Sequence, residues 1–475
     1  MRTAVPVALC VLGCLAGALA VARAAPPDAD GATAAAATAA ASSGPTHIAA
    51  RSGFVAIHAA PRPDAARIGM FRAGQVVPLR APTRATGPDV GPCAEGWYAL
   101  EPRGFVCPSE RTTFARDDAR VAAARELLPP PGAAYPYHYG LSRGAARYYR
   151  IPTAAEQRAT EWGLDARLAG LPAPSGPPPT PALARYFAER AASEAAEHLP
   201  LTGPLAPPGA KLAWSTELVA EGRVFVVTSE LELVPKDEVE ELPRVSGAGT
   251  SSPALPFALS VTEGPRFVPA ADAAPVPGAM RESGRFGRRA LLPLAAPPAL
   301  VGPYAALADG GFARASDLGI FVARPRPTDV GPAERWLHVS VHAGTLVAYE
   351  GDRPVYAALA SPGMSGAAPD AEYGTPPGRY RIAQKWLTGD MSGRLNGGGW
   401  RTREVPFVAY YDGSYAVHGA FWHDVFGRPR SHGCINLTPA DASALFGWLE
   451  PALPSEWYAV ASDASHAGTT LLVTR

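Results

Sequence analysis

Glycine and proline interrupt this chain at short intervals, and their frequency limits what it can fold into. The sequence has 48 Gly and 52 Pro among 475 residues. Glycine favours turns, and proline ends helices and central strands, so the apolar segments between them stay short. A chain of this length also exceeds one ordinary hydrophobic core. The sequence therefore predicts a mainly β, multidomain protein whose small domains are joined by loop-rich stretches.

The N-terminus has the parts of a secretory signal peptide. Arg2 is followed by an apolar run from Val5 to Ala22, and a small-residue pattern ends at Ala24. We expect cleavage after Ala24, export to the periplasm or cell envelope, and no stable transmembrane span afterwards. The alternative is a lipoprotein anchored at Cys14, which we rank second because the apolar region before this cysteine is short. Residues 25–45 are rich in Ala, Thr and Ser and are predicted to be a flexible tether.

The charge balance excludes some partners. The chain has 43 basic and 43 acidic residues, for a formal net charge of +0. Neither a nucleic-acid interface nor an electrostatic membrane anchor is expected from such a balance. A mixed-charge polymer or a peptide is the partner that the composition favours.

Residues 46–115 alternate short apolar stretches with Gly, Pro and Asp turns, which predicts a small β-barrel. The segment resembles the Src-homology-3-like modules of secreted cell-wall enzymes, with a generic β-domain as the alternative. Cys93 and Cys107 flank two predicted hairpin strands, Trp97–Leu100 and Gly104–Val106. Such strands bring two Cβ atoms to bridging distance, so we predict a disulfide contributing about 2–3 kcal/mol.

Residues 116–330 combine helical and strand patterns and predict a mixed α/β middle region with Pro-rich linkers and no assigned role. The expected helices are Asp117–Leu128, Ala154–Leu168 and Thr180 to about His198, and the expected strands are Arg223–Val227 and Leu231–Val234. A further stretch, Gly311–Leu318, resembles the closing strand and turn of another small barrel.

The C-terminal pattern is that of an antiparallel β domain. A three-stranded meander is predicted over Trp336–Val341, Thr345–Tyr349 and Arg353–Leu359. Asp412-Gly413 is a strong hairpin signal, and it places His418 at the end of the second strand of that hairpin. Thr438-Pro439-Ala440-Asp441 is expected to cap a short helix that packs on the sheet.

The run SHGCIN at Ser431–Asn436, with His418 upstream, supplies the groups needed for acyl transfer. Cys434 is the candidate nucleophile, and His418 is the base that removes its proton. The Gly419 carbonyl is expected to orient the imidazole, and the N–H groups of Gly433 and Cys434 to form an oxyanion hole. If Cys93 and Cys107 pair, Cys434 is the one unpaired cysteine of the exported chain, which favours a reactive role.

Residues around these catalytic candidates are assigned to loop support or to substrate. His432 is expected to take part in the chemistry or, alternatively, to brace the turn. The predicted substrate-binding residues are Ser431, Asn436, Trp422 and Tyr410, although aromatic residues of a small β domain are more often core. His423 and Asp424 are expected to be solvent-facing or to lie at the edge of the substrate site.

Residues 334–475 resemble the catalytic domain of bacterial L,D-transpeptidases, the cysteine enzymes that cross-link peptidoglycan. The resemblance rests on His418 with the run Ser431–Asn436, on the first hairpin, and on Thr375–Ile382. It implies that Cys434 attacks a tetrapeptide stem, releases D-alanine and passes the acyl group to an amine. The acceptor is then another stem, giving a 3→3 cross-link, or a lysine of an envelope protein. If water is the acceptor, the enzyme is an L,D-carboxypeptidase.

Two other classes of function remain open from the sequence. A zinc hydrolase would use His418, His432 and Cys434, but their spacing is unlike that of tetrahedral zinc sites, so neither metal nor cofactor is expected. A non-catalytic cell-wall-binding protein with an idle thiol is the second alternative.

Overall fold

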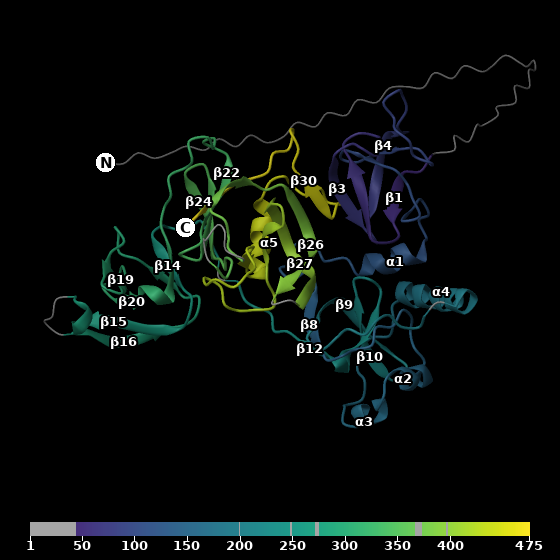
Figure 1. The fold of residues 1–475 in the computed structure, drawn as a ribbon, viewed down its shortest axis with the longest axis horizontal. Coiled ribbons are helices and arrows are strands. Elements are labelled where there is room, and N and C mark those ends of the chain that lie inside the picture. The colour runs from purple at the N-terminus through teal and green to yellow at the C-terminus, as the bar shows by residue number, and fades with distance from the viewer. Residues whose placement is uncertain (1–43, 199, 248, 271–274, 366–372, 396–397) are drawn as a thin grey trace, which may run out of the picture. The chain divides into compact units, whose positions relative to one another are not determined.

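The structure is a computed structural model that describes residues 44–198, 200–247, 249–270, 275–365, 373–395 and 398–475. The predicted signal peptide (1–24), Cys14 and all but the end of the predicted tether lie outside these residues. The described part is mostly β, with five sheets and five α-helices (Figure 1). The prediction of a mainly β protein is confirmed.

Seven short strands form the N-terminal part of the largest sheet, in the order β3-β2-β6-β5-β4-β1-β7. Their bounds are β1 (His47–Ala50), β2 (Phe54–His58), β3 (Arg67–Arg72), β4 (Val76–Arg84), β5 (Tyr98–Leu100), β6 (Phe105–Val106) and β7 (Thr112–Thr113). In β2, Val55 and Ile57 are buried while their neighbours are more exposed, because successive side chains of a strand point to opposite faces.

The N-terminal strands continue directly into the C-terminal region. Strand β3 pairs antiparallel with β30 (Ala459–Ala461), Gly69 lying opposite Val460. A Cβ at Gly69 would lie 2.3 Å from the Trp457 ring, so this contact requires glycine. In the described residues the end strands β3 and β7 do not pair with each other, and no closed barrel is found. The small barrel predicted for residues 46–115 and its Src-homology-3-like resemblance therefore stay predictions.

A disulfide joins Cys93 and Cys107, whose Cα atoms are 5.9 Å apart. The intervening strands β5 and β6 pair antiparallel, with Tyr98 opposite Val106. Both the hairpin and the cysteine pairing agree with the prediction. Among the described residues, Cys434 is the free cysteine.

The middle region contains four α-helices beside a five-stranded sheet of order β11-β10-β9-β8-β12. The elements are α1 (Ala119–Glu126), β8 (His138–Ser142), α2 (Ala154–Thr160), α3 (Leu164–Leu168), α4 (Pro181–Glu197), β9 (Lys211–Ala220), β10 (Arg223–Thr228), β11 (Leu233–Pro235) and β12 (Val239–Glu241). Helix α4 begins after Thr180, whose hydroxyl accepts a hydrogen bond from the Leu183 N–H, as the Thr-Pro signal predicts.

The single helix predicted over Ala154–Leu168 is two helices, α2 and α3. Gly163, between them, has a φ of 70°, a left-handed conformation that interrupts a helix and that glycine adopts readily. Glu161, two residues before Gly163, has a buried carboxylate that accepts hydrogen bonds from Tyr148 and Arg223. The prediction was wrong because these tertiary contacts and the glycine outweigh the helical spacing.

Residues 257–321 form two small sheets. A three-stranded sheet contains β14 (Phe257–Ser260), β17 (Leu291–Pro293) and β21 (Leu318–Phe321), and a five-stranded sheet contains β15 (Gly264–Pro269), β16 (Met280–Phe286), β18 (Leu300–Val301), β19 (Tyr304–Ala306) and β20 (Phe312–Arg314). Three 3-10 turns are η1 (Lys236–Glu238), η2 (Pro277–Ala279) and η3 (Ala315–Asp317). The stretch Gly311–Leu318 is thus a strand and a turn, but it closes no barrel in the described residues.

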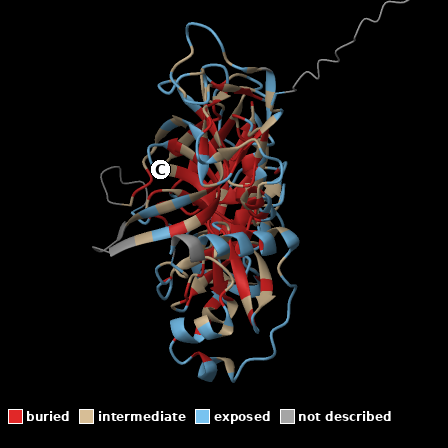
Figure 2. Ribbon diagram, turned by 90° about the vertical axis from the view of Figure 1, so that its right-hand side faces the viewer, coloured by how far each residue is buried: buried red, intermediate tan, exposed pale blue. Residues whose placement is uncertain are grey.

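The C-terminal region places two sheets and one helix around a common core. The six-stranded sheet contains β13 (Thr250–Ser251), β24 (Arg353–Leu359), β23 (Thr345–Glu350), β22 (Arg335–Ser340), β31 (Thr470–Thr474) and β25 (Gly378–Arg381); the largest sheet adds β26 (Gln384–Leu395), β27 (Gly398–Asp412), β28 (Tyr415–Gly419) and β29 (Ile435–Leu437). Leu337, Phe407 and Leu445 of helix α5 (Pro439–Trp448) share this core. Figure 2 shows the buried residues gathered inside these sheets. The predicted meander and the Asp412-Gly413 hairpin are both present.

Helix α5 starts as its sequence predicts. The Thr438 hydroxyl accepts a hydrogen bond from the Asp441 N–H at 3.1 Å, and Pro439 occupies the first turn. The helix packs on β27 and β28. This packing fixes the chain shortly after Cys434.

A buried ion pair connects three regions of the chain. Arg72 of β3 lies 3.0 Å from Glu404 of β27, and it also donates to the hydroxyl of Tyr137. Burial alone would raise the pKa of Glu404, but the charge and hydrogen bonds of Arg72 hold it below its usual value. Glu404 also accepts hydrogen bonds from the hydroxyls of Ser229 and Thr388.

Candidate active site

His418 and Cys434 come together because two neighbouring strands run parallel. In the pairing of β28 with β29, Val417 lies opposite Ile435 and His418 opposite Asn436. Cys434 directly precedes β29, so it lies level with Ala416, two residues before His418 on the neighbouring strand β28. Both residues line the same pocket.

The imidazole of His418 is buried and held in one orientation. Its Nδ1 lies 3.0 Å from the carbonyl oxygen of Gly419. Because a carbonyl only accepts, Nδ1 carries the proton and Nε2 keeps a free lone pair. Burial lowers the pKa of His418 to about 4, although the Gly419 hydrogen bond opposes this shift. His418 is therefore a neutral base at physiological pH.

The Cys434 thiol is partly buried in the same pocket. Its Sγ lies 3.7 Å from the carbonyl oxygen of Ser414. Burial raises the pKa of the thiol to about 11, and a hydrogen bond from the Ala416 N–H opposes the rise. The resting pair is thus a neutral thiol beside a neutral imidazole.

Ser431 and Thr375 brace the loop that carries Cys434. The Ser431 hydroxyl accepts a hydrogen bond from the Gly433 N–H at 3.0 Å and donates one to the Cys434 carbonyl. The Thr375 hydroxyl donates to the Gly433 carbonyl at 2.8 Å. The Gly433 N–H is therefore engaged within the loop, which counts against its predicted place in an oxyanion hole. The Ser431 hydroxyl likewise makes its hydrogen bonds within the loop.

Gly433 cannot be replaced without strain. Its φ is 121°, a conformation that L side chains rarely adopt. A Cβ at this position would lie 2.5 Å from the ring of Tyr415. The glycine thus allows the close turn that presents Cys434.

His432, in the loop that carries Cys434, lies among aromatic rings. Its ring is stacked on Trp400 at 5.1 Å and meets Tyr373 edge-on at 5.0 Å. Burial lowers the pKa of His432, and the positive charge of Lys211 lowers it further. Its Nε2 has no hydrogen-bond partner among the described residues. This environment is compatible with contact to a bound substrate.

Asn436 and His423 form a buried pair behind the pocket. The amide nitrogen of Asn436 lies 3.0 Å from Nε2 of His423, and the His423 ring packs on Phe426 at 4.7 Å. The expectation that His423 faces solvent is wrong, because the chain folds it under the loop. Asp424 is half exposed and pairs with Arg288.

The pocket around Cys434 has a volume of about 470 Å³. Of the predicted residues, those that line it are His418, Trp422, Tyr410, Ser431, His432, Cys434 and Asn436. Trp422 lies 5.8 Å from His418, ring centre to ring centre. Gly419 and Gly433 support the site from behind through the contacts described above.

The sequence of this region matches a known family. Residues 334–466 match the family model described as YkuD, L,D-transpeptidase catalytic domain. These residues form an L,D-transpeptidase catalytic domain.

Solved L,D-transpeptidases resemble the chain over its C-terminal part. The one from Mycobacterium smegmatis is 22% identical (TM-score 0.24), and the match covers 30% of this chain and 59% of that one. The one from Xylanimonas cellulosilytica is 24% identical (TM-score 0.22), with 32% and 64% covered. L,D-transpeptidase 3 from Mycobacterium tuberculosis, solved with a faropenem-derived adduct, is 23% identical (TM-score 0.23), with 30% and 61% covered. The chain thus spans less than two thirds of each. No curated protein gave a match.

Some residues in or near this pocket were not predicted from the sequence. Lys211, from the middle region, reaches the Trp422 ring, with Nζ 5.8 Å from its centre. Arg430 and Tyr415 also line the pocket. Thr375 belongs to the segment Thr375–Ile382, which carries part of the family resemblance. That resemblance is the sequence signal from which Thr375 could have been identified. Nothing in the local sequence marks Lys211.

Neither a metal cluster nor a membrane helix is found in the part of the chain that the structure describes. There, no three His, Cys, Asp or Glu side chains are grouped to hold a metal ion. The ligands of the zinc alternative, His418, His432 and Cys434, line one pocket without forming such a group. No helix in those same ranges is both long and apolar enough to cross a bilayer.

Proposed function

We propose that this chain is an exported cysteine L,D-transpeptidase that acts on peptidoglycan tetrapeptide stems through a Cys434 acyl-enzyme. The observation that carries the proposal is the pairing of β28 with β29, which puts a tautomer-fixed His418 and the Cys434 thiol into one pocket. The L,D-transpeptidase family match supports the same substrate class. Export and a periplasmic or envelope location rest on the N-terminal sequence.

The first half-reaction transfers the acyl group to sulfur. Nε2 of His418 takes the thiol proton while the sulfur attacks the carbonyl between the third and fourth residues of the stem. The C–N bond of the tetrahedral intermediate then breaks. The departing D-alanine amine receives the proton from the imidazolium, and a thioester remains on Cys434.

The second half-reaction reverses these roles. A neutral amine of another stem attacks the thioester, His418 accepts the proton that the amine loses, and the C–S bond breaks. The thiolate takes the proton back, and a 3→3 cross-link is released. A protein lysine or water at the same step gives protein attachment or L,D-carboxypeptidase activity.

Mass spectrometry of the mature protein incubated with a tetrapeptide muropeptide tests the proposal. We expect a mass gain on the peptide containing Cys434, no gain in Cys434→Ala, and an acylation rate about 10²–10⁴ lower in His418→Ala. His342→Ala is the matched control, because His342 is exposed on the turn between β22 and β23. Unchanged acylation in Cys434→Ala would refute the proposal, and the released product identifies the acceptor.

A further inference from the structure

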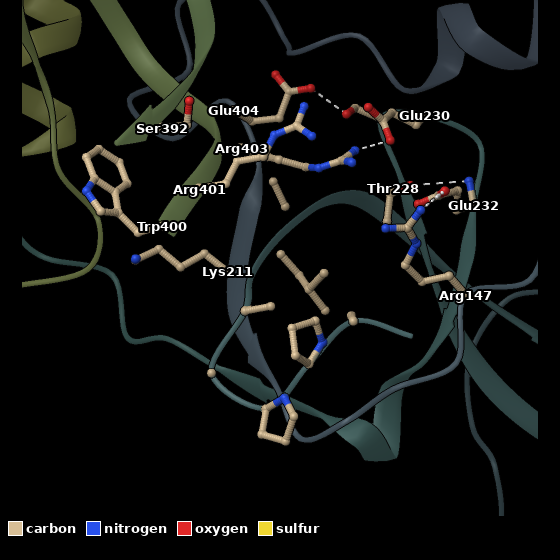
Figure 3. A pocket seen from close by; sticks show the side chains of 18 of the residues that line it. Arg147, Lys211, Thr228, Glu230, Glu232, Ser392, Trp400, Arg401, Arg403 and Glu404 are labelled. Atoms are coloured by element: carbon tan, nitrogen blue, oxygen red, sulfur yellow. Dashed lines mark hydrogen bonds and ion pairs between the residues drawn. The ribbon is translucent and has the colours of Figure 1, made fainter. Parts of the chain in front are cut away.

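A second and larger cavity adjoins the pocket of Cys434. Its volume is about 890 Å³, and it lies between the middle-region strands and the β26–β27 hairpin (Figure 3). Ser392, Gly393 and Trp400 line both this cavity and the pocket of Cys434. The two spaces therefore share part of one wall, and the larger one lies next to the place where a molecule would react at Cys434.

The arginines of this cavity are already paired with acids. Arg147 lies 2.8 Å from Glu232, Arg403 pairs with Glu230, and Arg401 pairs with Asp390 at 2.5 Å. Figure 3 shows the first two of these pairs on the wall of the cavity.

Lys211 differs from these arginines, because no carboxylate among the described residues pairs with it. It starts β9, where it lies opposite Leu141 of β8, and its side chain is half-buried. Burial lowers its pKa, and no acidic group opposes that shift. A half-buried cation without a counter-charge is costly unless a ligand supplies one. Lys211 is thus a cation without a carboxylate partner among the described residues, on the wall of the larger cavity and close to Trp422 and His432, which line the pocket of Cys434.

Lys211 and His418 are both neighbours of the Trp422 ring. The Nζ of Lys211 lies 5.8 Å from the centre of the Trp422 ring, and the same ring lies 5.8 Å from that of His418. His418 protonates the amine that leaves and deprotonates the amine that enters. Lys211 is thus a cation beside the Trp422 ring, near the place where both amines react, and an amine with a carboxylate on the neighbouring carbon offers it an anionic partner.

We propose that Lys211 binds the carboxylate next to the reacting amine, and that the larger cavity holds the rest of the acceptor stem. The assignment rests on the proposed function and names the acceptor class of that site. D-Alanine, which leaves, carries a carboxylate on the carbon that bears its amine. A stem diamino acid whose side-chain amine also has a neighbouring carboxylate presents the same pair of groups when it enters. A protein lysine lacks this carboxylate, so Lys211 selects stem peptides over protein lysines.

The step at Cys434 is the aminolysis already described, and Lys211 changes only the affinity for the amine. A charge-assisted hydrogen bond to the carboxylate corresponds to a preference of about 10- to 100-fold.

An acceptor competition tests the assignment. The full mature chain is acylated with a tetrapeptide, and exchange is followed with D-alanine and with D-alaninamide, which lacks the carboxylate. We expect wild type to use D-alanine at a KM at least 10-fold below that of Lys211→Met, with kcat little changed. The two proteins should use D-alaninamide alike, and Lys211→Arg should restore part of the preference.

Lys236→Met is the matched control, because Lys236 belongs to the same region but is paired with Glu217 and Glu241. It should behave as wild type. Equal use of the two acceptors by wild type and Lys211→Met would overturn this assignment and leave the acyl-enzyme intact. Failure of the wild type to acylate at Cys434 would overturn the proposed function and the assignment with it.

Discussion

The Cys434 thiol should titrate far above neutral pH in the free enzyme. Burial raises its pKa from 9.0 to about 11. A shift of two pH units lowers the thiolate fraction at neutral pH by about 100-fold, since each unit is a factor of ten. His418, with a pKa of about 4, carries no charge at that pH and so does not stabilise the thiolate. The resting thiol should therefore be a weak nucleophile toward simple reagents.

The rate of alkylation by iodoacetamide as a function of pH measures this property. The modified peptide that contains Cys434 is quantified by mass spectrometry under conditions where circular dichroism shows an intact fold. We expect the rate to keep rising with pH toward about 11, whereas an unfolded control peptide levels off near about 8.5. The Cys93–Cys107 disulfide leaves these two cysteines unmodified as an internal control.

A rate that reaches its plateau below about pH 8 would refute the reasoning, because it would show a thiolate and imidazolium formed in advance. His418→Ala separates the two cases further. With a neutral resting pair, the variant keeps the alkylation midpoint and loses acylation. With a resting ion pair, both change together.

Three further predictions concern the fold and the base. Glu404→Gln leaves the buried Arg72 without a counter-charge and should lower the free energy of unfolding, measured in urea, by about 3–5 kcal/mol. Glu189→Gln removes an exposed ion pair and should change this free energy by less than about 0.5 kcal/mol. Equal effects of the two substitutions would contradict the role of the buried pair. Gly433→Ala should keep the fold, as judged by circular dichroism, but lower kcat/KM for the tetrapeptide at least about 10-fold, because the strained loop misplaces the nucleophile. For His418, the acid limb of kcat/KM should fall near pH 4, and a midpoint near 6.5 would argue against its burial. The unfolded chain binds this proton near pH 6.5 and the folded chain only near pH 4, so acidification between these values should cost up to about 3 kcal/mol of stability, measurable by urea unfolding.

The parts of the site that could be predicted are those that local chemistry determines. The Asp412-Gly413 turn sets the hairpin that ends at His418, and Thr438 sets the start of α5. Cys434 lies in the sequence between this hairpin and the start of α5. Its position near the end of the hairpin and the start of the helix could therefore be predicted. The Cys93–Cys107 pairing was likewise accessible, because both cysteines flank one hairpin.

The parts that escaped prediction depend on contacts between distant segments. The apolar run in β3 predicts a strand, but it does not name β30 as the neighbour of that strand. Lys211 reaches the Trp422 ring from a separate sheet, and no spacing along the chain signals that approach. The Gly433 N–H was assigned to an oxyanion hole because the acceptor that occupies it, the Ser431 hydroxyl, could not be located without the loop conformation.

The sheet that runs from β30 into β3 has a practical consequence for the expression of fragments of this protein. A fragment that begins at residue 334 lacks β3, so one edge of β30 would keep unpaired backbone amides. The side chain of Trp457, which is 1% exposed in the whole chain, would also become exposed to solvent. Open strand borders of this kind template aggregation. Recombinant protein for assays should therefore begin before His47. Poor solubility of shorter versions would then reflect an exposed strand edge and not a change at Cys434.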